Sequence, residues 1–473
     1  MEVSKVSIQN MLGTRLDVSF HRNKFSFESK IFPLKELREL VDINPPVNLD
    51  HLGKDDLISF IPMEVVDENN GVIIKALSKR VVESKGYTKF QNGDLLWAKI
   101  TPCMQNGKSA IACNLQNGVG CGSTEFFVLR PKNHEVLIEY IHYLMRDLRF
   151  LEAAMNSFGG NAGQQRVAKS YIEKVNIPFP PLYVQQRIVD IYNKAKREKQ
   201  EKEKESQRLL DEIDTYLLAQ LGIELPKKQQ VELTFKVKAS TLIGGRYNPF
   251  SYSAKTATLQ ELITSSPIKK KRVNEMLVLS SAGDWGTDED EADVKDFIRC
   301  LVIRSTEFDN QYNLNLDSSR VKYRMVKRDK LEKMDLQEGD ILVEKSGGSE
   351  DQPVGRVALL TSDMLQENTL SYSNFIHKIR LDKAQVNPEY AFYFLRTMYR
   401  IGMTESMQSQ TNGIRNLSMP SFLKQYLLLP DNQEEITEQI NHKYAQARKN
   451  QEQAKRIILE AKEQIERIIL RRI

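Results

Sequence analysis

Gly-Asp-Leu-Leu at residues 93–96 and Gly-Asp-Ile-Leu at residues 339–342 are two copies of one pattern in a chain of 473 residues. They lie about 250 positions apart, close to half the chain length, which is the spacing expected for a duplicated domain rather than for a solenoid of short repeats. The pattern itself indicates a turn that leads into a strand, because glycine and aspartate favour turns.

Other patterns recur in the same order on both sides of these two stretches. Gly-Lys-Ser-Ala at 107–110 returns as Gly-Arg-Val-Ala at 355–358, and Glu-Tyr-Ile-His-Tyr-Leu at 139–144 returns as Glu-Tyr-Ala-Phe-Tyr-Phe at 389–394. Asn-Ala-Gly at 161–163 is followed by Arg166, Thr-Asn-Gly at 411–413 is followed by Arg415, and Pro181 matches Pro430. Because the order is kept throughout, we infer that the chain contains two copies of one globular domain.

Each copy has the signals of a mixed domain of strands and helices. Apolar, β-branched or turn-led runs predict strands at 57–66, 94–100, 297–306 and 340–345, and apolar spacings of three and four predict helices at 136–150 and 389–401. Residues 170–173 fit a capping box, and Pro420 suits the first turn of a short helix after Ser418. The predicted fold class is therefore α+β.

A long charged helix follows each copy, at about 185–221 and 434–470. Each helix has a narrow apolar stripe and a length of about 55 Å, at about 1.5 Å per residue. Such a stripe needs one facing partner, and the alternative of a solitary solvated helix is marginal in stability. We therefore predict that the two helices pair as an antiparallel coiled coil. Gly222 suits the end of the first helix.

These features divide the chain into four segments. Residues 1–184 form the first domain, with 1–29 as an extension, and residues 185–222 form the central helix. Residues 223–433 form the second domain, and residues 434–473 form the terminal helix.

The composition limits the class of protein. No apolar run approaches the roughly 18 residues of a membrane span, and the first ten residues lack the apolar core of a signal peptide. We therefore expect a soluble, cytoplasmic protein. A net charge of +5 permits binding of nucleic acid without requiring it.

Motifs that would indicate catalysis are missing or incomplete. Asn-Pro-Pro-Val at 44–47 has valine where the base-stacking motif of amino-methyltransferases has an aromatic residue, so it is interpreted as a turn. Asp340, Glu344 and Lys345 lack the spacing of a metal-dependent nuclease core. The six histidines and four cysteines show no metal-ligand spacing, and no phosphate-binding loop follows the glycines at 347–348. We expect no catalytic residue, no metal and no cofactor in this chain.

The arrangement resembles the specificity subunits of type I restriction-modification systems. The resemblance rests on residues 39–45, 93–100, 123–131, 180–189 and 411–417, and it extends from about residue 30 to the end. The extension 1–29 and the acidic stretch 284–296 have no counterpart in the pattern. The resemblance implies that each domain is a target-recognition domain that reads one half of a bipartite site in double-stranded DNA. It also implies that the helices space the domains and bind two methyltransferase subunits, which carry S-adenosylmethionine, and that restriction-translocase subunits join this complex.

Polar residues beside the repeated glycines are the candidate DNA contacts, because arginine and lysine bind phosphate or guanine while glutamine and asparagine read adenine. They are Lys99, Thr101, Gln105, Lys108, Gln164, Gln165 and Arg166 in the first domain, and Lys345, Ser346, Arg356, Asn412, Arg415 and Asn416 in the second. Any one of them could instead be a solvated or turn-stabilising residue.

Two other classes of function remain open. The chain could be a coiled-coil scaffold that assembles a complex without reading DNA, or an enzyme whose site is not recognisable. DNA binding at rising salt separates these classes, because a specific reader loses affinity steeply but keeps its preference for one sequence.

Overall fold

The computed structural model describes residues 27–155, 157–159, 165–225, 236–237, 253–289, 295–309, 313–318, 320–348, 352–411 and 414–470. The chain forms two compact units. Unit 1 comprises Met1–Lys202 and Glu452–Ile473, and unit 2 comprises Glu203–Gln451. The extension 1–29 therefore lies almost entirely outside the described residues, except that Phe27 is buried and stacks on Phe150 in unit 1.

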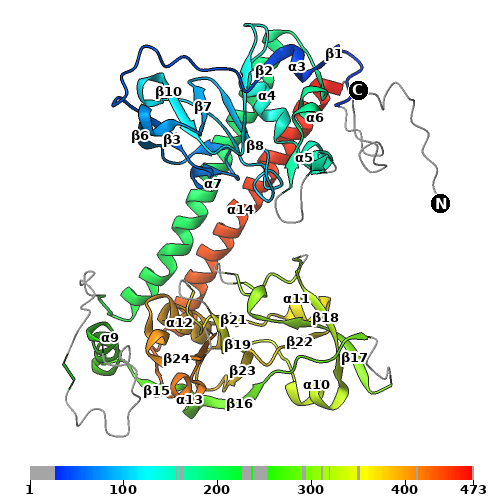
Figure 1. Cartoon of the computed structure of the whole chain (residues 1–473). Helices are drawn as coiled ribbons and strands as arrows, with labels where there is room; N and C mark the ends of the chain where they lie inside the picture. Colours follow the sequence, from blue (N-terminus) through cyan, green and yellow to red (C-terminus); the bar gives the residue numbers. More distant parts are fainter. Residues whose placement is uncertain are drawn as a thin grey trace. The chain divides into compact units, whose positions relative to one another are not determined.

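Unit 1 is built on two four-stranded sheets (Figure 1). The first has the order β2-β11-β8-β9, with every neighbour antiparallel: β2 is Val41–Ile43, β11 Phe126–Pro131, β8 Leu95–Ala98 and β9 Ser109–Ile111. The second has the order β6-β3-β10-β7, in which β3 and β10 are parallel: β6 is Leu77–Arg80, β3 Leu57–Ile61, β10 Val119–Gly122 and β7 Thr88–Gln91. Trp97 and Phe127 stack in the core behind the first sheet.

Shorter elements complete unit 1. Three strand pairs are β1 (Leu34–Glu36) with β14 (Asn176–Pro178), β4 (Val66–Asp67) with β5 (Val72–Ile73), and β12 (Phe158–Gly159) with β13 (Arg166–Val167). The short helices are α3 (Leu37–Leu40), α4 (Ile138–Met145), α5 (Leu148–Met155) and α6 (Lys169–Glu173).

Unit 2 repeats this plan. Its first sheet has the order β16-β23-β19-β21: β16 is Leu277–Ala282, β23 Ile376–Leu381, β19 Ile341–Glu344 and β21 Val357–Leu359. Its second sheet has the order β18-β17-β22, with β17 and β22 parallel: β18 is Lys322–Lys327, β17 Phe297–Ile303 and β22 Leu370–Tyr372.

The remaining strands of unit 2 are β15 (Lys270–Arg272) paired with β26 (Tyr426–Leu428), and the ribbon β20-β25-β24, with β20 Ser346–Gly348, β25 Ile414–Leu417 and β24 Gln408–Thr411. Its helices are α9 (Ala254–Ser265), α10 (Arg328–Met334), α11 (Ser362–Glu367), α12 (Pro388–Arg400) and α13 (Met419–Leu423).

Individual side-chain contacts also recur at equivalent positions within each unit, which confirms the predicted duplication. The buried carboxylate at the start of β8, Asp94, binds Arg130 at 2.7 Å, and Asp340 at the start of β19 binds Arg380 at 2.7 Å. The Tyr140 hydroxyl donates to the Pro178 carbonyl at 2.9 Å, and the Tyr390 hydroxyl donates to the Leu428 carbonyl at 2.8 Å. The same side chains therefore tie the same strands and helices together in both copies.

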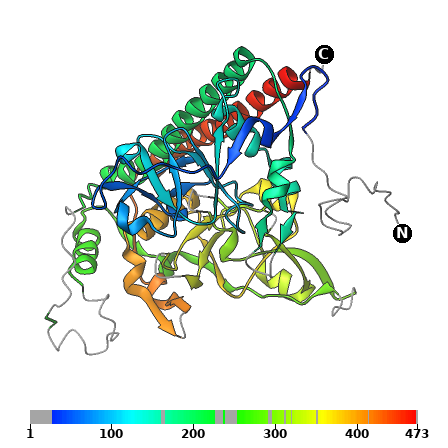
Figure 2. The same ribbon diagram turned by 45° about the horizontal axis from the view of Figure 1, so that its top comes forward.

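The long helices α7 (Leu182–Gln220) and α14 (Gln433–Leu470) lie side by side and antiparallel (Figures 1 and 2). In unit 1, Ile188 near the start of α7 shares a core with Ile465 near the end of α14. In unit 2, Ile213 near the end of α7 shares a core with Ile440 near the start of α14. The predicted pairing is confirmed, and Gly222 ends α7 with φ +62°, as predicted.

The structure corrects several local predictions. The strands predicted at 57–66 and 297–306 end at Ile61 and Ile303, and a short 3-10 helix follows each of them. The helix predicted at 136–150 is two helices, because α4 ends at Met145 and the Asp147 carboxylate accepts from the Arg149 amide at 2.9 Å at the start of α5. The capping box predicted at 170–173 is wrong, because Ala168 is the residue before α6 and Ser170 lies inside its first turn. Ser418, by contrast, caps α13 with its side chain.

Within the described residues, no helix is both long and apolar enough to cross a membrane. The same residues contain no group of three or more histidine, cysteine or acidic side chains placed to hold a metal ion. The division into four segments at residues 184, 222 and 433 stays a prediction.

Candidate nucleic-acid interface

The end of β8 and the short strand β13 bring four of the predicted unit 1 residues together. Ile100 forms an antiparallel bridge with Arg166. On either side of this bridge, the Val167 amide donates to the Lys99 carbonyl at 2.9 Å, and the Thr101 amide donates to the Gln165 carbonyl at 3.0 Å. Lys99, Thr101, Gln165 and Arg166 are therefore neighbours, although they come from segments about 65 residues apart.

An ion pair with Glu125 holds the Arg166 guanidinium. Nε and Nη2 of Arg166 each donate to one oxygen of that carboxylate at 2.8 Å. This hydrogen bonding holds the pKa of the Glu125 carboxyl below its usual value. The Arg166 side chain keeps 41% of its surface exposed, so it can still meet a ligand, but in an orientation that Glu125 fixes.

The remaining described candidates of unit 1, Gln105 and Lys108, lie with Lys99 in the segment between β8 and β9. The Lys99 ammonium is 5.4 Å from the centre of the Phe127 ring, and Lys108 Nζ donates to the Met63 carbonyl at 3.3 Å. Gln105 is exposed, with its amide 3.3 Å from the sulfur of Met155. Of these three side chains, Gln105 is the one most open to solvent.

Unit 2 assembles the corresponding residues between β19, β20 and β25. The Leu417 amide donates to the Lys345 carbonyl at 2.7 Å. The Ser346 hydroxyl donates to Oδ1 of Asn416 at 2.6 Å, which fixes that amide group. Lys345, Ser346, Arg415 and Asn416 are therefore neighbours, as Lys99, Thr101, Gln165 and Arg166 are in unit 1.

The hydrogen-bond register corrects the predicted equivalence of Arg166 and Arg415. Arg166 forms its β-bridge with Ile100, whereas Asn416 pairs with Ser346. Asn416 is therefore the counterpart of Arg166. Arg415 is one position earlier and is the counterpart of Gln165. Because side chains alternate between the two faces of a strand, a shift of one residue places Arg415 and Arg166 on opposite faces of equivalent ribbons.

Arg415 differs from Arg166 in its surroundings as well. Its side chain is partly exposed, and its guanidinium has no hydrogen-bond or ion-pair partner among the residues that the structure describes. The position equivalent to Glu125 is Phe375, because the Lys99 amide donates to the Glu125 carbonyl and the Lys345 amide donates to the Phe375 carbonyl. Unit 2 thus lacks the carboxylate that orients Arg166 in unit 1.

Arg356, predicted as a DNA contact, is instead a buried structural residue. It is 8% exposed, and its guanidinium donates to both oxygens of Glu344, at 2.8 and 2.7 Å. Two further bonds of 2.8 Å go to the carbonyls of Phe308 and Ser305. A buried guanidinium with all these partners holds the loop after β17 against β19 and β21, and is not available to DNA.

Gln164 and Asn412 lie outside the described residues, so their part in the interface stays a prediction. The acidic stretch 284–296 is described at 284–289 and 295–296. It contains Trp285, an exposed aromatic residue that the sequence reasoning missed. The sequence feature that could have indicated it is a tryptophan beside glycines, in a stretch that has no counterpart in the first copy.

The comparisons with known proteins agree with the duplicated architecture. The model of the family described as "Type I restriction modification DNA specificity domain" matches residues 29–210 and 257–460. The specificity subunit of the type I restriction enzyme EcoEI of Escherichia coli is 36% identical over 178 residues, which are 36% of this chain and 30% of that protein. The EcoAI specificity subunit of Escherichia coli is 37% identical over 173 residues, 35% of this chain and 29% of that protein.

The chain thus spans less than a third of the length of the curated relatives that it matches. A solved chain from a study of complex assembly and conformational transition of the type I R-M system aligns with 94% of this chain and 98% of its own length, at 13% identity and a TM-score of 0.48. The family match alone covers most of both halves of the chain. The protein therefore belongs to the family of type I restriction modification DNA specificity domain proteins.

Proposed function

We propose that this chain is the sequence-recognition subunit of a type I restriction-modification complex, with each unit reading one half of a bipartite site in double-stranded DNA. One observation carries the proposal: the two units keep one scaffold but differ in the polar residues at equivalent positions of the same ribbon. Gln165 and Arg166 in unit 1 correspond to Arg415 and Asn416 in unit 2. Two copies with different donors and acceptors suit two different half-sites.

The proposed DNA contacts are the described candidate residues that either have an accessible side chain or lie in the hydrogen-bonded segments described above. They are Lys99, Thr101, Gln105, Lys108, Gln165 and Arg166 in unit 1, and Lys345, Ser346, Arg415 and Asn416 in unit 2. Their chemistry supports both kinds of contact that a specific complex needs, because lysines bind phosphates while arginine and amide side chains read base edges.

The proposal gives the long helices and the partner proteins separate roles. The helices space the two units and bind two methyltransferase subunits, which carry S-adenosylmethionine, and restriction-translocase subunits join them in the cytoplasm. The chain itself contributes recognition and no catalytic residue. The pairing of α7 and α14 within each unit supports a structural role for them, since each helix has residues in both units.

Exchange of one unit tests whether recognition is modular. Replacing residues 31–180 with the corresponding segment of another family member should change one half of the methylated motif and leave the other half unchanged, because the exchanged segment contains the unit 1 sheets and not those of unit 2. The measurement is the methylated motif of the assembled complex. Altered bases in both halves would refute modular reading, and binding of all sequences equally would favour a scaffold that does not read DNA.

Arg415→Ala tests the interface in unit 2. We expect DNA binding to weaken by about 1–3 kcal/mol, with relaxed preference at one base position, if the guanidinium reads a base. If it binds phosphate, the loss should be equal for all sequences and the salt slope should fall by about one.

Arg415→Lys is the matched variant for this test. It keeps the charge but loses the forked pair of donors, so it should rescue a phosphate contact and fail to rescue a base contact. Titrations of labelled duplex at several salt concentrations distinguish the two cases. Unchanged affinity and salt dependence in Arg415→Ala would show that this side chain is only a solvated residue.

A further inference from the structure

An open cavity of about 600 Å³ lies in unit 2 between the segment before β17 and the strand β18. Trp285 and Tyr323 line it and keep 37% and 41% of their surfaces exposed. Exposed aromatic rings in one cavity are unusual, since burying such a ring is strongly favourable. We call this cavity the Trp285 groove.

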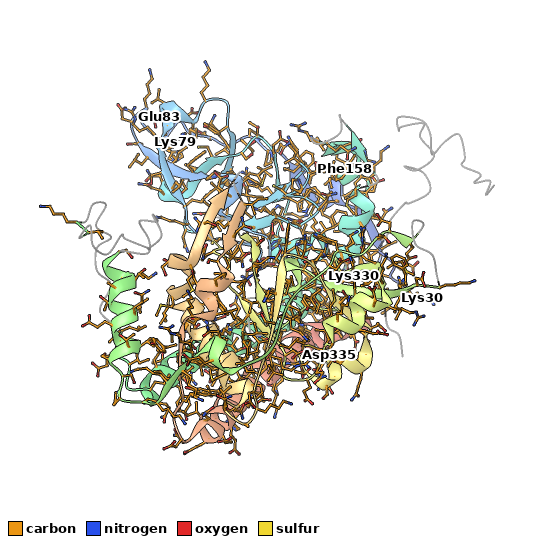
Figure 3. All side chains as sticks on the ribbon, turned by 90° about the horizontal axis from the view of Figure 1, so that it is seen from below. Lys30, Lys79, Glu83, Phe158, Lys330 and Asp335 are labelled. Atoms are coloured by element: carbon orange, nitrogen blue, oxygen red, sulfur yellow. The ribbon has the colours of Figure 1, made fainter. Side chains whose placement is uncertain are left out.

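The segment that carries Trp285 is held at several points. The Asp284 amide donates to the Tyr372 carbonyl at 2.8 Å, and Thr287 exchanges two backbone hydrogen bonds with Met325, at 2.9 and 3.0 Å. The Asp284 carboxylate also pairs with Lys330 of α10, which is labelled in Figure 3. The backbone on both sides of Trp285 is therefore anchored, so its ring is presented from a fixed position.

The charges around the groove favour an anionic ligand. Asp288 pairs with Arg324, and Glu289 accepts from Arg299 at 2.6 Å, so arginines neutralise both carboxylates of the lining. Lys322 also lines the groove, is exposed, and has no ion-pair partner among the described residues.

An arginine also covers part of the aromatic surface. The Arg299 guanidinium lies 4.0 Å from the centre of the Tyr323 ring and so covers one face of it, while Tyr323 keeps 41% and Trp285 keeps 37% of its surface exposed. Aromatic surface beside the exposed Lys322 ammonium group suits a nucleotide, with its base or sugar on the rings and its phosphate near the lysine.

The groove adjoins the DNA contacts proposed for unit 2. The Trp285 ring packs edge-on against the Phe375 ring, with centres 5.8 Å apart. The Phe375 carbonyl accepts from the amides of Lys345 and Ser346, at 2.7 and 3.2 Å. One residue thus connects the groove to the loop that holds the candidate contacts.

We propose that the Trp285 groove receives a nucleotide of the DNA bound by unit 2, with Trp285 and Tyr323 contacting its base or deoxyribose and Lys322 its phosphate. This inference rests on the proposed function and adds a specific contact to it. The described part of the acidic stretch, residues 284–289, then contributes to DNA recognition, because it supplies Trp285 and the carboxylates that pair with the arginines.

The chain offers a direct probe of this contact, because it has two tryptophans and the other one, Trp97, is fully buried in unit 1. The full chain is titrated with a duplex selected from a random-sequence library while tryptophan emission, quenching by acrylamide and anisotropy of labelled DNA are followed. DNA should shield Trp285 from acrylamide. The shielding should be absent in Trp285→Phe, whose remaining tryptophan is Trp97.

Variants of the lining residues measure the contribution to affinity. Trp285→Ala should weaken DNA binding about tenfold, whereas Trp285→Phe should keep most of the affinity because it keeps an aromatic face. Lys322→Ala and Tyr323→Ala change exposed side chains, so they test the groove even if Trp285→Ala folds poorly. Inorganic polyphosphate should bind without shielding Trp285, since it has no base or sugar.

The outcomes separate this inference from the proposed function. DNA binding by anisotropy without any change in Trp285 shielding would overturn the groove contact and leave the proposed function intact. The groove contact would also be overturned if polyphosphate shielded Trp285 as DNA does, or if Trp285 became shielded only when a methyltransferase subunit was added. Absence of any sequence-dependent DNA binding would refute the proposed function itself.

Discussion

Asp340→Asn should lower the free energy of unfolding of unit 2 by about 3–5 kcal/mol, the cost of removing one partner from a buried ion pair. Asp340 is fully buried and accepts from Nε and Nη2 of Arg380 at 2.7 and 2.9 Å. Its Oδ2 is also 3.2 Å from Nζ of Lys378, which is fully buried too. The substitution keeps the shape of the side chain but leaves two cations without their shared carboxylate.

The surroundings of Lys378 decide where in this range the loss falls. Burial already lowers the pKa of Lys378, and the attraction of Asp340 opposes that effect. Without Asp340, the lysine can lose its proton, and its amine still has the carbonyl of Asp335 at 2.7 Å as an acceptor. We therefore expect Asp340→Asn to lower the free energy of unfolding by less at high pH than at neutral pH.

Asp335→Asn is the matched control, and Asp335 is labelled in Figure 3. It binds the same arginine, with 2.7 Å between Nη1 of Arg380 and Oδ2 of Asp335, but 45% of its side chain is exposed. Its backbone has φ +39°, a left-handed conformation that asparagine tolerates. The loss should stay below about 1 kcal/mol, because solvent screens an exposed pair.

Denaturant unfolding followed by tryptophan emission measures both variants. Trp285 reports on unit 2, and the same titration in a Trp285→Phe background reports on unit 1 through Trp97. The unit 1 transition should not move. If Asp340→Asn and Asp335→Asn were equally mild, the buried carboxylate would not be the anchor of the first sheet in unit 2.

Insertion of seven residues into both long helices should lengthen the DNA spacer between the half-sites by about three base pairs. Seven residues keep the apolar stripe in coiled-coil register. They add about 10 Å to a helix, and DNA rises about 3.4 Å per base pair. The insertions follow Lys202 in α7 and Gln451 in α14, the residues at which each helix passes from one compact unit to the other along the chain. The bases within each half-site should not change, because neither set of sheets is altered.

The methylated motif of the modified complex is the deciding measurement. The insertion also turns one half-site by roughly a third of a turn of about 10.5 base pairs, so weaker binding is an expected accompaniment. Seven residues inserted into α7 alone are the control and should destabilise the pairing, since only one stripe shifts. Efficient methylation at the original spacing would show that partner subunits, and not α7 and α14, set the distance.

Some features could be predicted because their signals are local or repeated. The limits of α7 and α14 were predicted within three residues, since an apolar stripe and a terminal Gly222 do not depend on distant contacts. The duplication was visible because the copies keep their order. The break between α4 and α5 was not visible, since the side chain that interrupts the helix, Asp147, is an ordinary polar residue in the helical pattern.

The candidate site was predicted as a set of neighbours but not in its details. The spacing of the repeated patterns paired Arg166 with Arg415. A loop can differ in length by one residue without changing the sequence pattern. A shift of one residue moves a side chain to the other face of a strand. Arg356 looked like Lys108 in a matching motif, yet Glu344 and two carbonyls bury it. The sequence around an arginine does not show whether the fold places a carboxylate within hydrogen-bonding distance of it.

The sequence by itself determined the two copies, the α+β class and the paired helices, because these depend on periodicity and order along the chain. Only the tertiary structure decided which of the predicted cations are buried or held in ion pairs. Glu125 orients Arg166 from 41 positions away, whereas Phe375 stands in its place in unit 2 and leaves Arg415 without a carboxylate partner among the described residues. The reason is physical: an ion pair depends on distances of a few ångströms between strands, and strand pairing sets those distances.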